Sequence, residues 1–361
     1  MSEKQHKTIY INGKFLAQRL SGVQRCATEI VKALDEIAPG LPYEIVLLTP
    51  RRVMGRLALK HIAVRDCGHL QGTLWEQMEL PFHASDGCLM NLCNCAPLFK
   101  ARQAVILHDV SFMAVPQAYG CCYRLWHRLM SWVLGRRLPQ ILTDSYFSKG
   151  ELERYLAISS EKISVVYLGT EHMQKIVPDE GTMTELGLME GSYVLAVSSQ
   201  SLHKNFSLVL QAAELLPEVK FVIAGQQNPA VFKTAGFDEA PGNVVFTGYV
   251  DDSRLAALYK YAGCFVYPSL YEGFGLPPLE AMSYGTPVIA ARAASLPEVL
   301  EEAALYIDPH DEKELVGAII ALMEDAELRE RLIARGAEQC RKYSWHSTAE
   351  QIMERMVRII C

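Results

Sequence analysis

Short apolar runs alternate with longer amphipathic stretches along almost the whole chain, and this pattern limits the fold more than any other feature. Parallel strands buried on both faces need continuous apolar runs, while the helices that cross back between them need one apolar stripe. The alternation therefore predicts an α/β protein with parallel sheets. The runs that we predict as strands are Thr8–Ile11, Glu44–Thr49, Ala104–Leu107, Gln140–Thr143, Ile163–Val166, Tyr193–Val197, Lys220–Ala224, Val244–Phe246, Gly263–Tyr267 and Pro287–Ala290.

The length of the chain indicates two such units. Its 361 residues exceed the roughly 250–300 at which one hydrophobic core stops growing. Between residues 169 and 192 the pattern lapses into polar residues that predict a linker. We therefore predict a Rossmann-like domain over residues 1–170 and a second over residues 171–345, with the ligand site in a cleft between them. The amphipathic helix predicted at residues 346–361 can join the first domain or pack on the second.

Composition and charge argue against several classes of protein. A formal net charge of −6 argues against a nucleic-acid partner held by bulk electrostatics. No apolar run approaches the ~20 residues of a membrane-spanning helix, and the polar N-terminal residues carry no signal-peptide pattern. The ten cysteines are scattered and lack paired metal-binding spacing, so we expect reduced thiols and no zinc site. These observations predict a cytoplasmic protein.

The richest candidate site is the loop after the predicted strand Gly263–Tyr267. From Glu272 to Glu280 it reads Glu-Gly-Phe-Gly-Leu-Pro-Pro-Leu-Glu, so that two glycines precede prolines suited to a first helical turn. Free amides at such a helix start favour a phosphate. Carboxylates would repel a diphosphate, so the partners expected for Glu272 and Glu280 are the hydroxyls of sugars that flank it. This combination describes a nucleotide sugar, although Glu280 alone could simply complement the helix dipole.

Other loops at the same predicted strand ends carry further candidates. Lys204 follows the strand Tyr193–Val197 and could neutralise phosphates, although a single loop lysine is often only solvated surface. Gly22 follows the first strand and could let the backbone approach a phosphate. His108 and Asp109 close the strand Ala104–Leu107, where a histidine is either structural or functional.

Taken together, these motifs resemble glycosyltransferase family 4, the retaining enzymes of the GT-B fold. The matching elements are the E-x7-E pair Glu272 and Glu280, the run Ser-Tyr-Gly-Thr-Pro-Val-Ile at 283–289, Leu-Pro-Glu at 296–298 and Lys-Asn at 204–205. The resemblance implies two Rossmann-like domains whose parallel sheets face an interdomain cleft. It assigns the acceptor to the first domain and the nucleotide sugar to the second.

The resemblance also implies roles for individual residues. His108 and Glu272 would be the catalytic residues at the transferred sugar, with Asp109 as a helix cap or supporting partner of the histidine. Glu280 would bind the ribose, and Lys204 the diphosphate. The donor-binding residues implied in full are Gly22, Lys204, Gly273, Phe274, Gly275, Leu276 and Glu280, and those implied at the base are Tyr249 and Val250.

One position departs from the family pattern. Members often carry an arginine in the loop before the lysine, where this chain has Ser198, Ser199 and His203. Charge neutralisation then rests on Lys204, on backbone amides and on a protonated His203. No Asp-x-Asp motif is present, so we expect no metal and no other cofactor, with amides and Lys204 balancing the charge of the leaving group.

The segments at 107–112 and 275–282 resemble those of mannosyltransferases in bacterial surface-polysaccharide assembly. This resemblance implies GDP-mannose as the donor and a lipid-linked saccharide as the acceptor, with UDP-sugars as the alternative donors. For retention we favour attack on the same face within an ion pair, with a donor phosphate oxygen taking the proton. A glycosyl-enzyme intermediate on Glu272 is the alternative.

Residues 121–137 predict a helix that mixes basic residues with tryptophans. Its expected polar stripe is Arg124, His127, Arg128, Ser131 and Gly135. Such a helix can lie in the interface of an anionic membrane and so bring a lipid-linked acceptor to the cleft at its inner face. The other interpretation is a helix packed on the core with a solvated basic face.

Three other functions compete with glycosyl transfer. A nucleotide-sugar isomerase or epimerase of GT-B-like architecture would convert the donor without an acceptor. A nucleotide-binding scaffold would bind the donor without transfer. An NAD-dependent oxidoreductase is disfavoured, because no G-x-G-x-x-G follows an early strand with an acidic residue ~20 positions on.

Overall fold

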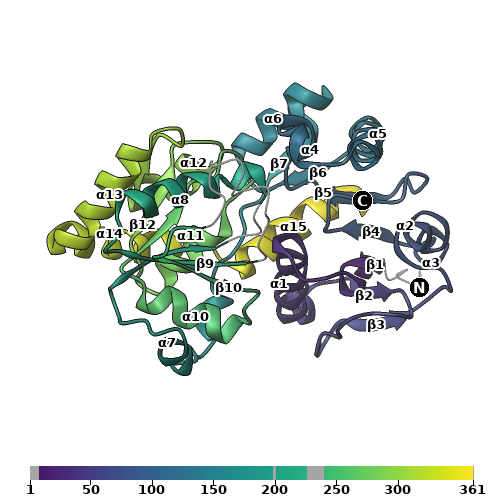
Figure 1. Ribbon diagram of the computed structural model, residues 1–361. Coiled ribbons are helices and arrows are strands. Elements are labelled where there is room, and N and C mark those ends of the chain that lie inside the picture. Colours follow the sequence, from purple (N-terminus) through teal and green to yellow (C-terminus); the bar gives the residue numbers. More distant parts are fainter. Residues whose placement is uncertain (1–7, 198–200, 226–239, 361) are drawn as a thin grey trace. The chain divides into compact units, whose positions relative to one another are not determined.

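The computed structural model describes residues 8–197, 201–225 and 240–360, which form two compact α/β units (Figure 1). Unit 1 comprises Met1–Gly169 and Ser344–Cys361, and unit 2 comprises Thr170–Tyr343. The sequence had suggested a division at residues 170 and 345. The last helix, α15 (Trp345–Ile360), belongs to unit 1. The strands of both units pair in parallel, which confirms the predicted fold class.

Within its described residues, unit 1 contains a seven-stranded sheet in the order β3-β2-β1-β4-β5-β6-β7. The strand order reverses between β1 and β4, because β2 and β3 lie on one side of β1 and all later strands lie on the other. We call this place the reversal point of the sheet. The strands are β1 (Thr8–Asn12), β2 (Glu44–Thr49), β3 (Ala63–Asp66), β4 (Cys88–Asn91), β5 (Gln103–Ile106), β6 (Ile141–Thr143) and β7 (Ile163–Val165).

Helices cover unit 1 because each carries an apolar stripe. In α1 (Gly22–Ile37) the buried residues Cys26, Ile30 and Leu34 recur at helical spacing, and this helix packs against α15. Over β5, β6 and β7 the core is closed by α5 (Cys121–Arg137) and α6 (Tyr146–Leu156). The shorter helical segments are η1 (Gly13–Ala17), η2 (Ala38–Gly40), α2 (Gly72–Leu74), η3 (Trp75–Glu79), α3 (Leu80–His83), α4 (Ser111–Ala114), η4 (Pro116–Ala118) and η5 (Ser160–Lys162).

Unit 2 has a six-stranded sheet among its described residues, in the order β10-β9-β8-β11-β12-β13. Its strand order reverses between β8 and β11, which is the reversal point of this sheet. The strands are β8 (Tyr193–Val197), β9 (Lys220–Ala224), β10 (Val244–Gly248), β11 (Cys264–Tyr267), β12 (Val288–Ala291) and β13 (Ala304–Ile307). The helical segments among the described residues are η6 (Met173–Lys175), α7 (Gly181–Glu185), η7 (Leu202–Lys204), α8 (Phe206–Leu215), α10 (Asp252–Tyr261), α11 (Leu276–Ser283), α12 (Leu296–Leu300), η8 (Glu301–Ala303), α13 (Glu312–Glu324) and α14 (Ala326–Cys340).

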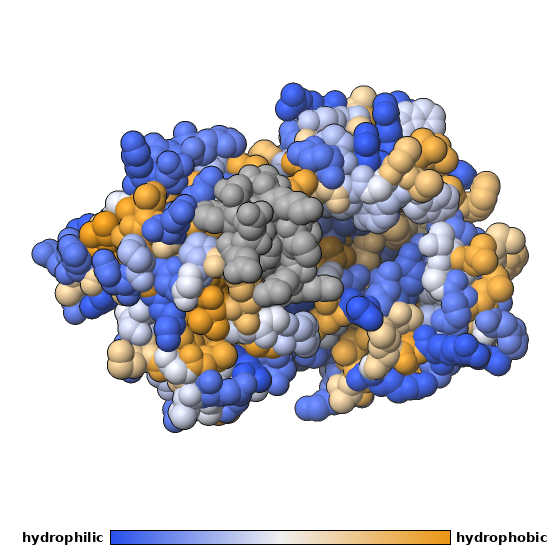
Figure 2. Space-filling view, viewed as in Figure 1, coloured by the Kyte–Doolittle hydropathy of each residue, from blue (hydrophilic) through white to orange (hydrophobic). Residues whose placement is uncertain are grey.

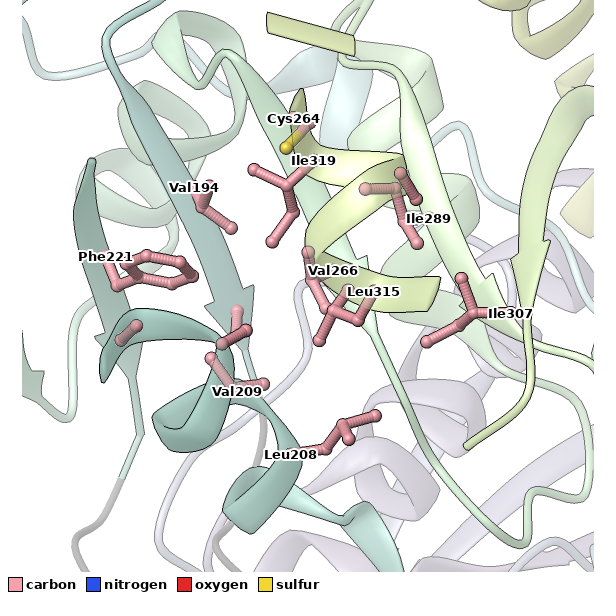
Figure 3. Packing of buried hydrophobic residues seen from close by; sticks show 14 of the residues in the cluster. Val194, Leu208, Val209, Phe221, Cys264, Val266, Ile289, Ile307, Leu315 and Ile319 are labelled. Carbon is pink, nitrogen blue, oxygen red and sulfur yellow. The ribbon is translucent and has the colours of Figure 1, made fainter. Parts of the chain in front are cut away.

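The core of unit 2 lies between its sheet and the helices α8 and α13. Figure 3 shows Val209 of α8 and Leu315 of α13 directed toward Val194 and Val266 on the strands. All four side chains are almost completely buried. Burying each such side chain contributes roughly 1.5–3 kcal/mol, so this packing fixes the strand ends from which the loops of the candidate site begin.

The predicted strands are confirmed to within a few residues, but three strands were missed. Their residues are Ala63–Asp66 in β3, Cys88–Asn91 in β4 and Ala304–Ile307 in β13. Strand β3 is exposed along its whole length, so it shows no apolar run. The other two have four residues each, which is too short for a periodic signal to stand out.

Candidate functional site

The loop that follows β11 is shaped by Gly275, which caps the start of α11. Its φ of 93° lies in the left-handed region that favours glycine. A Cβ atom built on it would lie 2.7 Å from Cδ2 of Leu296. The whole loop from Glu272 to Leu276 is buried. The turn therefore needs a glycine at this position both for its conformation and for space.

Glu272 and Lys204 form an ion pair at the carboxyl ends of two neighbouring strands. Lys204 Nζ lies 2.6 Å from Oε1 and 2.8 Å from Oε2 of Glu272, and 3.4 Å from the hydroxyl of Tyr267. Burial alone would raise the pKa of Glu272, but the attraction and hydrogen bond of Lys204, with the hydrogen bonds of Tyr267 and Ser269, outweigh it and lower that pKa. Glu272 is thus held ionised next to a cation.

This ion pair lies at the reversal point of the unit 2 sheet. Lys204 ends η7 after β8, and Glu272 follows β11, the strand on the other side of the reversal. In open parallel sheets, ligands bind beyond the carboxyl ends of the strands at this point. The structure therefore brings two predicted residues together at the position that the topology favours for a ligand.

Glu280 lies in the second turn of α11, because α11 begins at Leu276. Its carboxylate is buried between two partners from distant segments. His172 Nε2 lies 3.2 Å from Oε1, and the hydroxyl of Tyr259 donates to Oε2 at 3.0 Å. A buried carboxylate with two partners does more than complement a helix dipole, since a dipole acts mainly on charges in the first turn.

Ser295 contacts the backbone of the loop at two positions. Its hydroxyl lies 3.1 Å from both the carbonyl of Glu272 and the carbonyl of Phe274, and its side chain is fully buried. Phe274 in turn packs edge-on against Tyr343, with ring centroids 5.4 Å apart. The predicted donor-binding residues Gly273 and Phe274 therefore lie in a segment that is held by contacts with Ser295 and Tyr343.

His108 lies at the carboxyl end of β5 in unit 1 and is buried. Its Nδ1 lies 2.6 Å from Oδ2 of Asp144, and its Nε2 lies 3.0 Å from the carbonyl oxygen of Leu92. Burial lowers the pKa of a histidine, but the Asp144 carboxylate and the Leu92 carbonyl both favour the protonated ring, and the pKa of His108 is raised. Asp109 accepts from the N–H of Ser111 at 2.8 Å, near the start of α4.

Both ring nitrogens of His108 are therefore occupied by partners within unit 1. The contact with the donor sugar that we predicted for His108 would have to replace the Leu92 carbonyl as the partner of Nε2. That role stays a prediction. The raised pKa and the buried carboxylate support a second, structural role for the histidine in joining β5 to the end of β6.

The remaining predicted residues lie at exposed or half-buried positions. Gly22 is exposed at the first position of α1, where a Cβ atom would meet nothing within 4 Å. Tyr249 is 77% exposed after β10, and Val250 beside it is half-buried. Their roles toward phosphate and base stay predictions. Ser198 and Ser199, which stand where the family often has an arginine, lie outside the described residues.

The predicted helix at 121–137 is confirmed as α5, but its faces differ from the prediction. His127, Ser131 and Gly135, which we expected on a polar surface stripe, are buried against the rest of unit 1. The exposed side instead combines arginines with large apolar side chains, among them Leu125, which is 67% exposed, and Trp132, which is 45% exposed. Figure 2 shows hydrophobic and hydrophilic patches next to each other over the region of α5.

Sequence reasoning missed two groups of polar residues. The first comprises Asp144, His172, Tyr259 and Ser295, which support the predicted residues. For Asp144 a signal existed, since it directly follows β6 and so lies at the same sheet edge as His108. For His172 there was none, because its contact with Glu280 spans 108 positions of the chain.

The second group is a buried network at the reversal point of unit 1. Lys14 Nζ lies 2.5 Å from Oε2 of Glu76, and Asn12 donates to Oε1 of Glu76 at 2.9 Å and to Asn91 at 3.0 Å. Asn12 and Asn91 end β1 and β4, the strands on either side of the reversal. Asn12 was visible as the residue after an apolar run, but β4 had not been predicted.

None of the helices among residues 8–197, 201–225 and 240–360 is long and apolar enough to span a bilayer.

Comparison with known proteins supports a common origin with one enzyme family. The family described as Glycosyl transferases group 1 matches residues 184–339, which lie in unit 2. The chain is 32% identical over 265 residues to O-antigen chain mannosyltransferase B of Escherichia coli, an alignment that covers 69% of this chain and 68% of that protein. It is also 29% identical over 226 residues to the serotype-specific mannosyltransferase WbdA of Escherichia coli.

The alignment with WbdA covers 58% of this chain but 26% of WbdA, so the chain spans about a quarter of that relative. Among solved structures, HepE from Anabaena in complex with UDP-glucose is similar with a TM-score of 0.74 at 19% identity, over 98% of this chain and 100% of that one. At this identity the likeness shows the fold alone.

Proposed function

Because this chain belongs to the group 1 glycosyl transferases and has the GT-B fold, we propose that it transfers mannose, with retention, from GDP-mannose to a saccharide acceptor. The acceptor is lipid-linked, and the reaction belongs to the assembly of a bacterial polysaccharide. Glycosyl transfer itself follows from the family. The donor, the acceptor and the stereochemical course are our proposal.

The observation that carries the proposal is the ion pair of Lys204 and Glu272 at the reversal point of the unit 2 sheet. A nucleotide sugar offers a diphosphate to an ammonium group and sugar hydroxyls to a carboxylate. Donor binding would separate the pair, moving Lys204 onto the diphosphate and Glu272 onto the transferred sugar. In the absence of donor, each residue neutralises the other and avoids the cost of an unpaired buried charge.

Glu280 and the glycine-rich turn complete the proposed donor site. Glu280 binds the ribose, with Tyr259 and His172 holding its carboxylate in place. The amides of the turn from Gly273 to Leu276 bind phosphate oxygens, and Tyr249 with Val250 contacts the base. Departure of the nucleotide needs no metal in this scheme, because Lys204 and the amides stabilise the developing charge. We expect EDTA to leave the transfer rate unchanged.

Mannose is favoured over other sugars by the relatives, which are named as mannosyltransferases. A UDP-sugar is the second candidate donor, since HepE, which shares the fold, was crystallised with UDP-glucose. The two donors differ in both base and sugar, so direct binding separates them. We place the reaction at the cytoplasmic face of the cell membrane, where nucleotide sugars meet lipid-linked acceptors.

The exposed side of α5 is the surface proposed to contact that membrane. Apolar side chains next to arginines are typical of helices that lie in the interface of anionic bilayers. We expect co-sedimentation with phosphatidylglycerol vesicles, weakened by Leu129→Asp, whose side chain is half exposed. Equal sedimentation of the wild type and the variant would contradict this contact.

The test of the proposed function measures thermal shift with GDP-mannose, GDP-glucose, UDP-glucose and UDP-galactose, followed by transfer of the radiolabelled sugar. A bound donor raises the unfolding midpoint in proportion to its saturation. We expect the largest shift with GDP-mannose, and at least a tenfold loss of affinity in Glu280→Gln, equal to about 1.4 kcal/mol. Glu302→Gln, at an exposed position, is the matched control. Conversion of the donor without any acceptor would indicate an isomerase or epimerase instead.

A further inference from the structure

A concave site lies in unit 1, beside the exposed side of α5. It is a pocket of about 540 Å³ lined by residues of α4, α5 and α6. Its walls include Phe112, Leu125 and Tyr155 together with three arginines. A volume of this size is within the range of small-molecule sites, roughly 300–1,000 Å³.

The arginines give this pocket a strong positive charge. They are Arg124 and Arg128 of α5 and Arg154 of α6, and no acidic residue is among the described residues that line the pocket. The guanidinium of Arg154 lies 3.6 Å from Glu151 and over the ring of Tyr155. The side chains of Arg124 and Arg128 make no ion pair or hydrogen bond with any described part of the chain.

Arg124 and Arg128 are one helical turn apart, so their like charges face the same side of α5 and repel each other. Without a counter-ion this arrangement destabilises the helix slightly. An anion in the pocket would remove that repulsion and could accept from both guanidinium groups. Phosphate is the anion that matches such a cluster best, since guanidinium groups donate to its oxygens in pairs.

The pocket is larger than one phosphate group needs, and its rim is apolar. Leu125 lines the pocket and is 67% exposed, and Leu129 and Trp132 continue the exposed apolar surface along the next turns of α5. Solvent-exposed leucines and a tryptophan next to an arginine cluster suit a ligand with a charged head and a hydrophobic chain. A free phosphate compound would leave this apolar surface unused.

We propose that the pocket binds the phosphate or diphosphate group of a lipid-linked saccharide acceptor, with the lipid chain along Leu125, Leu129 and Trp132. The inference rests on the proposed function, because it takes the acceptor to be lipid-linked. It adds the site that recognises the acceptor by its phosphate and chain, independently of its sugar.

The probe that tests the proposal is farnesyl diphosphate, titrated by calorimetry in solution with GDP at saturation, so that the donor site is already occupied. We expect binding to the wild type and at least a tenfold weaker binding to Arg124→Ala/Arg128→Ala, since two charge-assisted contacts are lost. The matched control is Arg51→Ala/Arg102→Ala, which removes the same charge from exposed positions of unit 1 outside the pocket.

Inorganic diphosphate and phosphatidylglycerol vesicles separate the other possible occupants. We expect inorganic diphosphate to compete, but to bind at least tenfold more weakly than farnesyl diphosphate. Equal affinity for the two would overturn the assignment to a lipid, and binding of vesicles without binding of farnesyl diphosphate would assign the arginines to a bilayer surface instead.

Three results would contradict the proposal that the pocket binds the acceptor's phosphate group, while leaving the proposed function intact. They are no binding of farnesyl diphosphate by the wild type, equal binding by the pocket variant, and equal weakening by the control variant. Failure of GDP and GDP-mannose to bind the wild type would instead contradict the proposed donor. Both substituted arginines of the pocket are exposed and unpaired within the described chain, so we expect unchanged unfolding midpoints, which thermal unfolding of both double variants checks.

Discussion

At the scale of single residues, the ion pair of Lys204 and Glu272 makes a prediction about stability. Lys204→Ala leaves the Glu272 carboxylate buried without its cation, which costs about 3 kcal/mol in unfolding free energy. Lys342→Ala is the matched control, because its pair with Glu301 is half exposed and contributes at most about 1 kcal/mol. Chemical denaturation followed by circular dichroism measures both. Equal losses in the two variants would contradict a buried pair.

The same variant has a definite pH dependence. In the wild type the pKa of Glu272 is below its ordinary value of 4.5, so the stabilisation is present above that value and is lost as the pH falls through the lowered pKa. In Lys204→Ala the largest effect opposing burial is lost and only the hydrogen bonds of Tyr267 and Ser269 remain, so the pKa of Glu272 is higher than in the wild type. The variant is therefore penalised most at higher pH, where the carboxylate is ionised without its cation. Its deficit in unfolding midpoint should therefore be larger at pH 8 than at pH 5.

For the pair of His108 and Asp144 we predict the opposite dependence of stability on pH. The pKa of His108 is raised above 6.5, so its contribution to stability is complete below 6.5 and is lost as the pH rises through the raised value. Asp144→Asn should lower the unfolding midpoint at pH 6 and flatten this loss between pH 6 and pH 9. Glu350→Gln, beside the exposed His346, is the control. If the unfolding midpoint of Asp144→Asn fell between pH 6 and pH 9 as steeply as that of the wild type, the pair would not be the cause of this pH dependence.

At the scale of elements, sequence patterns predicted the strands that are apolar and the loops that follow them. Since the carboxyl ends of parallel strands share one edge, the order of strands was enough to place Lys204 and Glu272 in the same region. It could not supply the partner of Glu280, because His172 lies in a short segment with no pattern of its own. Nor could periodicity show which face of α5 is buried, since arginines and leucines share its exposed side.

The turn before α11 predicts a contrast between two glycines. Gly275→Ala places a Cβ atom in left-handed backbone and against Leu296, which should cost roughly 1–3 kcal/mol. Gly317→Ala lies in the exposed middle of α13, where nothing is within 4 Å, and should stabilise the protein by about 0.5–1 kcal/mol. The midpoints of thermal unfolding of the two variants should therefore shift in opposite directions. A shift of the same sign in both would refute the strained turn.

At the scale of the whole molecule, the C-terminal helix α15 returns the chain to unit 1 and packs on α1. Its side chains Ile352 and Met356 are completely buried. Residues at the end of the sequence thus stabilise the first sheet, while the family match at 184–339 lies entirely in unit 2. The two units should therefore respond separately to a change in α15.

Met356→Ala tests this division of the chain. Loss of the buried side chain costs about 2–5 kcal/mol, and the cost falls on unit 1, because Met356 belongs to that unit. Hydrogen exchange followed by mass spectrometry should show faster exchange in peptides from β1, α1 and β4, with β8 to β13 unchanged. Arg358→Ala, at an exposed position on the same helix, should alter neither set. Faster exchange throughout both sheets would mean that the units unfold as one cooperative body and that α15 stabilises the whole chain.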